Sequence, residues 1–570
     1  MNSPPVSIVV IFEDLHWIDS ETQGLLDVLA DSIANARILL LVSYRPEYRH
    51  EWSNKSHYSQ IRLDALGRES AREMLTELLG ETIALGPLKQ LIIERSEGNP
   101  FFIEEIVQSL FEEGALVRNG TVRLTRPLEA LKVPATVKAI IAARIDLLSE
   151  DRKDLLQALA TIGQEFSLSL VRSVMGKSDD DLGQMINDLR IGEFVYEQPA
   201  VGDAKYIFKH ALTQQVAYDS ILIEQRKALH ERIGATIETL FPDRLDDHLT
   251  DLAHHYRLSR NIRKALEYLQ RAGQNEARRS ACTAAIDYFR AALKLLETLP
   301  QSGEGQEHEL ALQLALGPSL YAAKGPGDPE VELVYNRARE LSEQIGDTSS
   351  LFSALYGLQS MYCFRSEWKM AEELARASLN LAEETGDSGM LIEGHHNLTW
   401  TEGWRGELLK CVSGAEKVKS LYDRTVHGSH SLKYGHDPLV CCTGLKALAL
   451  WTLGYPQQAL RSIDEAECLA HDLGHAFNET LTALNATWVQ GACGFFEESS
   501  TRTQALRKLC EEHGFGAPVG WALVFSGSNL AKQGQAERAI YEIEAGDADL
   551  RARKTEMGGA IQALAYSRCV

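Results

Sequence analysis

The sequence predicts a mostly α-helical protein that begins with a short α/β segment and continues into a long array of helical repeats. An apolar run from Val6 to Phe12, closed by acids, is typical of a buried strand. Most of the later chain has helical apolar spacing, and a unit of about 40 residues recurs in its second half. Because 570 residues are too many for one hydrophobic core, we expect four regions. They are residues 1–80, 81–149, 150–235 and 236–570.

Composition restricts the classes of function. The chain has 80 acidic and 58 basic residues, and its net charge of -22 would repel a phosphate backbone, which disfavours nucleic-acid binding. Nine cysteines without a CxxC pair indicate reduced thiols and a cytoplasmic protein. The longest apolar stretches, such as Val6 to Phe12, are far shorter than the ~20 residues that cross a bilayer, so no membrane partner is expected.

The first segment has a β-α-β pattern. Val6 to Phe12 predicts a parallel strand covered on both faces, a helix follows through Leu25, Leu26 and Leu29, and Arg37 to Tyr44 predicts a second strand. Gln60 to Leu63 is a candidate for a further strand. Ligands of open α/β sheets bind at the carboxyl ends of the strands, so the charged residues there are candidate site residues.

Glu13 and Asp14 form the candidate catalytic pair. An apolar strand followed by two acids is similar to a Walker B strand, where one acid helps to hold Mg²⁺ and the other activates the attacking water. Arg45 lies at the tip of the next strand, a position similar to the one where ATPases with such a strand often keep an arginine or polar sensor for the terminal phosphate. The alternative for the acidic pair is a solvated strand end beside a helix cap.

Several segments resemble one family of ATPases. IVVIFEDLHWIDSET, LLLVSYRPEY and ERSEGNPFFIEEIVQSLFEEG resemble the module of STAND-type AAA-related NTPases, specifically those fused to bacterial class III adenylate/guanylate cyclases. FKHALTQQVAYDSIL and LAHHY resemble the same proteins, so the resemblance runs to about residue 300 and more loosely through the repeats. It implies a P-loop-type fold that binds ATP and Mg²⁺, with Glu13 and Asp14 as the Walker B site. It also implies that Arg45, Gly98 and Pro100 bind the nucleotide, with Pro100 against the adenine.

The sequence departs from that family at one decisive place. It contains no GxxxxGK[ST] loop to cradle the phosphates, and only twelve residues precede Glu13. We therefore expect a partial ATPase core, truncated at its start and without the cyclase domain. Such a core would bind ATP weakly and be inactive alone, and Glu13 and Asp14 would hold Mg²⁺ only if a P-loop were supplied. Its exposed sheet edge would favour pairing with another chain, possible self-association included.

The middle of the chain predicts a helical lid and a winged helix. Helical spacing runs from Leu66 to Leu79 and from Pro87 to Gly114, and a hairpin is expected within Glu193 to Lys209. Winged helices often bind DNA, but the candidate recognition helix SDDDLGQMINDLR has four acids and one arginine, which favours packing within the protein. Four histidines lack metal-binding spacing and are interpreted as structural: His210, His230, His254 and His255.

The remaining chain predicts tetratricopeptide-like repeats. Gly346-Asp347 and Gly386-Asp387 lie 40 residues apart, as do Gly474 and Gly514, and a polar segment at 425–437 is expected to be an inserted loop. Small residues recur seven apart, which lets paired helices approach closely: Ala265 and Ala272, Ala285 and Ala292, and Ala459 and Ala466. Stacked units form a solenoid whose concave surface suits a protein partner.

These observations leave three hypotheses for the function. The first is a signal-transduction ATPase-type regulator, with ATP binding in intact relatives and partner binding by the repeats. The second is a catalytically inactive protein-interaction scaffold. The third is a STAND-type transcription regulator, which the acidic recognition helix disfavours.

Overall fold

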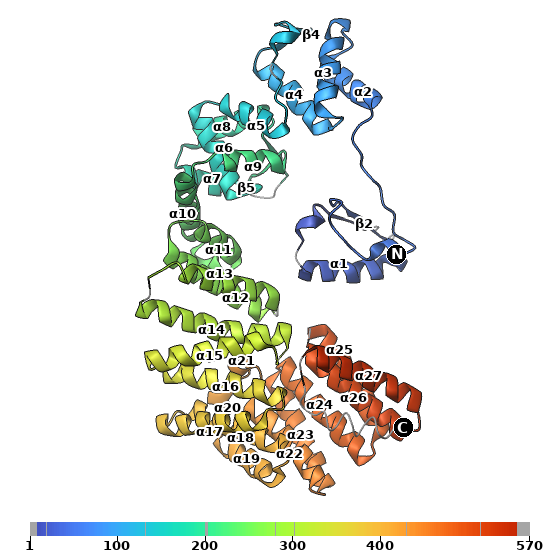
Figure 1. Ribbon diagram of the computed structural model, residues 1–570, viewed down its shortest axis with the longest axis vertical. Helices are drawn as coiled ribbons and strands as arrows, with labels where there is room; N and C mark the ends of the chain where they lie inside the picture. Colours follow the sequence, from blue (N-terminus) through green and yellow to red (C-terminus); the bar gives the residue numbers. More distant parts are fainter. Residues whose placement is uncertain are drawn as a thin grey trace, which may run out of the picture. The chain divides into compact units, whose positions relative to one another are not determined.

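The computed structural model shows a mostly α-helical chain with a helical solenoid and, among its described residues, three small sheets, which confirms the predicted fold class (Figure 1). It divides into two compact units, residues up to 245 with 258–260, and residues 246–257 with 261 onward. None of the described helices is long and apolar enough to cross a membrane. The described residues are 8–18, 20–131, 133–199, 203–279, 281–300, 302–325, 327–428, 430–513, 515–553 and 555.

The first sheet is a pair of parallel strands, β1 (Ile8–Phe12) and β2 (Ile38–Val42), joined through helix α1 (Ser20–Ser32). Phe12 and Val42 pack against Leu26 of α1, so one face of the sheet is covered. The opposite face is exposed although it is apolar, with exposed fractions of 46–63% for Val9, Ile11, Leu39 and Leu41. The prediction of a strand buried on both faces is therefore wrong, because the described residues supply a helix to one face only.

The expected strand at Gln60 to Leu63 is also wrong, since this stretch has no regular secondary structure. Ile61 and Leu63 are 83% and 91% exposed. A strand is stabilised by hydrogen bonds to a neighbouring strand, and none of the described strands lies beside this segment.

The predicted lid, residues 81–149, packs with the helix before it, Arg68–Leu79, in a small helical bundle with its own core. The helical spacing predicted from Pro87 to Gly114 belongs to two helices, because Glu97 (φ 52°) and Gly98 (φ 77°) both have a left-handed backbone and end the first. A Cβ at Gly98 would lie 2.3 Å from the carbonyl oxygen of Leu66, so only glycine fits there. The elements are α2 (Arg68–Leu79), α3 (Gly86–Ser96), α4 (Pro100–Glu112), β3 (Leu116–Asn119), β4 (Thr121–Leu124) and α5 (Val137–Asp146).

The next elements have the order of a winged helix, with a three-stranded antiparallel sheet arranged β5-β7-β6. The predicted hairpin forms the last two strands, and Phe194 and Phe208 are buried in the core beneath it. The elements are α6 (Glu150–Ile162), β5 (Glu165–Ser167), α7 (Leu168–Met175), α8 (Asp179–Ile191), β6 (Val195–Gln198), β7 (Lys205–Phe208), α9 (Ala211–Asp219) and α10 (Ile223–Leu240).

A buried ion-pair cluster ties the lid region to the winged helix. The Arg144 guanidinium on α5, 2% exposed, donates hydrogen bonds to Glu105 at 2.6 Å and Glu112 at 2.7 Å, both on α4. It also donates to the carbonyl oxygen of Gly192 at 2.5 Å and stacks 4.7 Å from the ring of Phe194. Burial raises the pKa of Glu105, and the charge of Arg144 opposes that rise. The cluster therefore links α4, α5 and the turn at Gly192, which are separated along the sequence.

The second unit is a solenoid of antiparallel helices, each packed on its neighbours in sequence (Figure 1). The six alanines of the predicted repeat are at most 2% exposed, and Gly346, Gly386 and Gly474 end helices in the left-handed conformation. Gly514 lies outside the described residues. The helices are α11 (Leu249–Arg257), α12 (Ile262–Arg278), α13 (Cys282–Leu296), α14 (Gly303–Lys324), α15 (Pro329–Ile345), α16 (Thr348–Phe364), α17 (Trp368–Thr385), α18 (Ser388–Trp404), α19 (Leu408–Leu421), α20 (Arg424–His427), α21 (His430–Tyr434), α22 (Pro438–Thr452), α23 (Pro456–Leu473), α24 (Ala476–Cys493), α25 (Phe496–His513), α26 (Gly516–Lys532) and α27 (Ala536–Ala552).

Two features of the solenoid were not expected. The inserted segment at 425–437 is not a plain polar loop but carries the short helices α20 and α21, and His427 and His430 are 2% and 9% exposed. The array also returns on itself, because a Cβ at Gly325, after α14, would lie 2.2 Å from the carbonyl oxygen of Arg553, after α27.

Candidate functional site

The structure places three of the sequence-predicted site residues at one edge of the first sheet. Because β1 and β2 are parallel, Glu13 and Asp14 after β1 and Arg45 after β2 follow the carboxyl ends of adjacent strands. All three are exposed. Asp14 has a left-handed backbone (φ 57°), and its N–H donates to the Ser43 hydroxyl at 3.0 Å, which links the two strand ends.

Gly98 and Pro100 lie at the start of α4 in the lid region. The N–H of Leu66 donates to the Gly98 carbonyl at 2.8 Å, and the Asn99 side chain caps α4 by accepting from Phe102 at 3.2 Å. Pro100 occupies the first turn of the helix, where its missing N–H costs nothing. Among the described residues, no hydrogen bond joins this pair to Glu13, Asp14 or Arg45. The nucleotide role of the five residues therefore stays a prediction.

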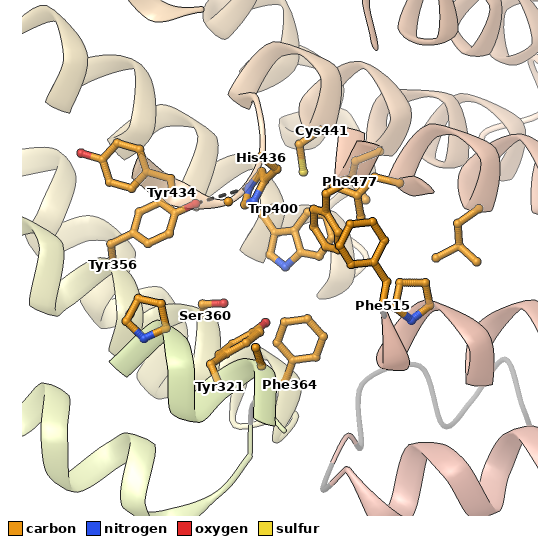
Figure 2. A pocket seen from close by; sticks show the side chains of 18 of the residues that line it. Tyr321, Tyr356, Ser360, Phe364, Trp400, Tyr434, His436, Cys441, Phe477 and Phe515 are labelled. Atoms are coloured by element: carbon orange, nitrogen blue, oxygen red, sulfur yellow. Dashed lines mark hydrogen bonds between the residues drawn. The ribbon is translucent and has the colours of Figure 1, made fainter. Parts of the chain in front are cut away.

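The solenoid encloses a cavity of about 2020 Å³, lined by residues from α12 through α26 and by Arg553 (Figure 2). Its walls are rich in aromatic side chains, which project into the space from successive helices. They include Tyr321, Tyr356, Phe364, Trp400, Trp488 and Phe515.

The charge of the cavity differs from that of the chain. Although the whole chain carries a net charge of -22, no aspartate or glutamate is among the described residues that line the cavity. The lysines and arginines among these lining residues are Arg278 and Arg553. Arg553 is itself paired with Asp549 at 3.1 Å, so the cavity is an apolar, aromatic space whose positive charge comes from Arg278.

One wall of the cavity carries a cluster of two histidines and a cysteine. The ligand atoms of His396, His436 and Cys441 all lie within 4.8 Å of one another. The Nε2 atoms of the two histidines are 3.3 Å apart, and the Tyr356 hydroxyl lies 3.3 Å from Nε2 of His436. Figure 2 shows Tyr356 directed at His436, with Cys441 beside the imidazole.

The fold holds this cluster from two elements. Glu393 and His396, three residues apart on α18, share one face of the helix, and Cys441 lies in the first turn of α22. Asp437 caps α22 through the N–H groups of Leu439 at 2.9 Å and Val440 at 3.0 Å. His436 directly precedes Asp437, so the hydrogen bonds of Asp437 restrain the backbone next to His436.

A second set of contacts anchors the same loop. The Tyr422 hydroxyl donates to the Asp437 carboxylate at 2.7 Å, and the Asp437 N–H donates to the Asn478 side chain at 2.9 Å. Asn478 in turn donates to the Ser431 hydroxyl at 3.0 Å. Asp437 and Asn478 are fully buried, so these bonds are shielded from water.

Electrostatics within the cluster favours a charged cysteine–histidine pair. Burial by itself would raise the pKa of the Cys441 thiol, but His396 and His436 outweigh it and lower that pKa to about 6. Burial likewise opposes charge on His396, yet Cys441 and Glu393 raise its pKa to about 10. The thiol and the imidazole therefore stabilise each other as thiolate and imidazolium.

Sequence reasoning missed both the cavity and this cluster. The segment at 425–437 contains three histidines and ends just before Cys441-Cys442, a local enrichment in metal-binding residue types that was interpreted only as an insertion. His396 is 40 residues from His436, and only the packing of α18 against α22 brings them together.

Comparison with known proteins gives distant likenesses. No family model matches the sequence. The chain is 25% identical over 531 residues to an uncharacterized protein of Rhizobium meliloti strain 1021, covering 91% of this chain and 50% of that protein. The chain therefore spans about half the length of the curated relative that it matches.

Two solved structures are also similar at low identity. One is the STAND protein with a tetratricopeptide repeat sensor from Pyrococcus horikoshii, with a TM-score of 0.38 and 12% identity over 99% of this chain and 83% of that one. The other is aspartyl phosphate phosphatase F from Bacillus subtilis, with a TM-score of 0.43 and 12% identity over 75% of this chain and 98% of that one.

Proposed function

We propose that this chain is a signal-transduction regulator of the STAND type whose repeat unit senses a protein partner. In this proposal the solenoid binds an extended segment of the partner that carries aromatic or aliphatic side chains and at least one acid. The observation that supports it is the aromatic cavity of the second unit, which has no carboxylate among its described lining residues.

The size of the cavity favours a polypeptide over a metabolite. Pockets for small molecules usually measure about 300–1,000 Å³. This cavity, at about 2020 Å³, would leave such a ligand largely surrounded by water. Aromatic side chains contribute much of the binding free energy at protein interfaces because they bury a large area with few rotatable bonds.

The charge of the cavity determines which segments fit. A lysine or arginine buried there would meet no described carboxylate and would lose its hydration without compensation. An acidic side chain or a C-terminal carboxylate can instead pair with Arg278, whereas Arg553 is already paired with Asp549. We therefore expect the bound segments to be apolar and acidic.

The first test is selection of a random dodecapeptide display library on the immobilised full chain. Selected peptides are expected to be enriched in aromatic residues and acids, and to quench the fluorescence of the cavity tryptophans. Trp400→Ala should weaken binding of a selected synthetic peptide at least about tenfold, because it removes a central aromatic contact. Trp17→Ala is the matched control, since Trp17 is 78% exposed and lies in the other unit.

Charge reversal separates the acidic preference from general hydrophobic binding. Arg278→Glu should weaken binding of acidic peptides more than of their amide counterparts, whereas Arg263→Glu, on a side chain 81% exposed and outside the cavity, should leave both unchanged. If the library yields no binders, or if the binders are indifferent to Trp400→Ala, the sensor proposal is wrong.

We also propose that ATP and Mg²⁺ binding, expected for intact relatives, requires a phosphate loop that this sequence does not contain. Calorimetric titration of the chain with ATP and Mg²⁺ is therefore expected to give no binding heat. Micromolar binding that disappears in Arg45→Ala would contradict this expectation and would indicate that the edge with Glu13 and Asp14 forms a nucleotide site. The absence of ATP binding together with peptide binding would favour an interaction scaffold.

A further inference from the structure

We infer that His396, His436 and Cys441 form a zinc site in the wall of the solenoid cavity, with three protein ligands and a fourth position open to the cavity. None of the sequence motifs of the ATPase family includes these residues. The inference depends on the geometry of α18 and α22 and not on the identity of the cavity's ligand.

The spacing of the ligand atoms suits tetrahedral zinc. Zn–N bonds of about 2.0–2.1 Å at tetrahedral angles place two coordinating nitrogens about 3.3–3.4 Å apart. The Nε2 atoms of His396 and His436 are 3.3 Å apart. The sulfur of Cys441 and one ring nitrogen of each histidine all lie within 4.8 Å of one another, whereas a Zn–S bond of about 2.3 Å requires an N···S spacing of about 3.6 Å, so Cys441 would move closer to the histidines on binding zinc.

The buried carboxylate of Glu393 lies beside the proposed ligand His396. Oε2 of Glu393, which is fully buried, lies 3.3 Å from Nδ1 of His396, and Oε1 of Glu393 is 2.6 Å from Nδ1 of His430. A carboxylate on the far nitrogen fixes the tautomer of a histidine so that the other nitrogen can bind metal. Although Oε2 of Glu393 and Nδ1 of His396 are close, neither has a hydrogen-bond partner in this arrangement, so Glu393 is placed to accept from Nδ1 of His396 and position its Nε2 once the two groups align.

Zinc would also balance the buried charge of this wall. A thiolate at Cys441 and the carboxylate of Glu393 together carry two negative charges, which Zn²⁺ neutralises. Buried charges are costly unless they are paired.

The ligand types select zinc among common metals. Thiolate and imidazole disfavour Mg²⁺ and Ca²⁺, which prefer oxygen. Copper sites with two histidines and a cysteine usually add a long axial methionine, and no methionine is among the described residues that line the cavity. Three protein ligands with one open position are the arrangement of zinc sites that exchange ligands.

The open position gives the site a role in ligand capture. His436 and Cys441 both line the cavity, so the fourth coordination position faces the space that the aromatic side chains enclose. A carboxylate of a bound segment can occupy it, in keeping with the acidic preference proposed above. This role rests on the proposed function, whereas zinc binding itself does not.

The test is a metal titration of the full chain after chelator treatment. Co²⁺ is expected to bind one per chain with a near-ultraviolet thiolate-to-cobalt band and the intense visible bands of tetrahedral cobalt, and Zn²⁺ should displace it. Cys441→Ser should remove the thiolate band and weaken zinc binding at least about 100-fold, and Glu393→Gln should weaken it about 10–100-fold. His436→Gln, at the half-buried cavity wall, should also remove tetrahedral binding.

The controls are the neighbouring residues of the same types. Cys442→Ser and His395→Asn change side chains adjacent to ligands but outside the cluster, and should leave zinc affinity within about twofold. Far-ultraviolet circular dichroism checks that each variant is folded. Zinc should also protect Cys441 from iodoacetamide, with exposed Cys468 as the internal reference.

Three results would overturn the inference. They are cobalt binding without a thiolate band, zinc affinity unchanged in Cys441→Ser, and alkylation of Cys441 that zinc does not slow. Binding of copper without measurable binding of zinc would overturn the choice of metal. Loss of peptide binding with retained zinc binding would instead count against the proposed sensor function alone.

Discussion

Replacing Arg144 with methionine is expected to lower the free energy of unfolding of the first unit by about 3–5 kcal/mol. The methionine would leave the carboxylate of Glu105, which is 3% exposed, buried without its cationic partner. Hydrogen exchange measured by mass spectrometry can localise the effect, because α4, α5 and the turn at Gly192 share the cluster. Faster exchange should appear in these segments before the second unit responds.

A matched control and a double variant separate burial from charge. Arg190→Met removes an ion pair with Glu197 whose side chains are 49% and 50% exposed, so the expected cost is below about 1 kcal/mol. Glu105→Leu combined with Arg144→Met removes the unpaired carboxylate and should recover part of the loss, because buried pairs can often be replaced by apolar groups. Equal costs for Arg144→Met and Arg190→Met would contradict the importance of burial.

Replacing Gly357 with alanine is expected to destabilise the solenoid by about 1–3 kcal/mol through overpacking. The ring of Tyr335 on α15 lies between Gly357 on α16 and Gly317 on α14. A Cβ at Gly357 would lie 2.4 Å from two ring atoms, and a Cβ at Gly317 would lie 2.6 Å from one. Since Tyr335 is 7% exposed, its ring cannot move without disturbing the cavity wall.

Thermal unfolding of the variants tests this steric explanation. Gly303→Ala is the matched control, because it adds a methyl group at the start of α14 with nothing within 4 Å. It should change the free energy of unfolding by less than about 1 kcal/mol. Combining Gly357→Ala with Tyr335→Ala should cost less than the sum of the two single changes, because the clash is absent without the ring. Strict additivity would show that Gly357 does not act through Tyr335.

Local patterns predicted those parts of the fold that local forces determine. Aromatic residues at alternate positions within Glu193 to Lys209 predicted the hairpin of β6 and β7, because one face of such a hairpin must be buried. They are Phe194, Tyr196, Tyr206 and Phe208. The small residues seven apart predicted closely packed helix pairs, and Ala285 and Ala459 are indeed fully buried between their helices. Each of these features depends only on contacts within one helix pair or one hairpin.

The sequence could not predict features that depend on distant partners. Whether an apolar strand is covered depends on which elements reach it, so β1 was expected to be buried although Ile11 is 63% exposed. Arg144 and Glu105 are 39 residues apart, and nothing in their local pattern indicates an ion pair. The same holds for His396 and Cys441. Glu13, Asp14 and Arg45 were chosen because they follow the ends of two predicted strands, whereas Gly98 and Pro100 came only from a resemblance.

The contact between Gly325 and Arg553 gives the repeat unit a geometric property that an open solenoid lacks. In an open array, a small change in the angle between two helix pairs only swings the free end through water. Here the backbones after α14 and α27 are in contact. The separation of these two points therefore depends on all the angles between successive helix pairs from α14 to α27. Both residues also line the cavity, so an occupant that spreads the helices by a small amount at several places would open that contact at one place. Small rotations of several helix pairs would therefore add up to one displacement, at the contact between Gly325 and Arg553.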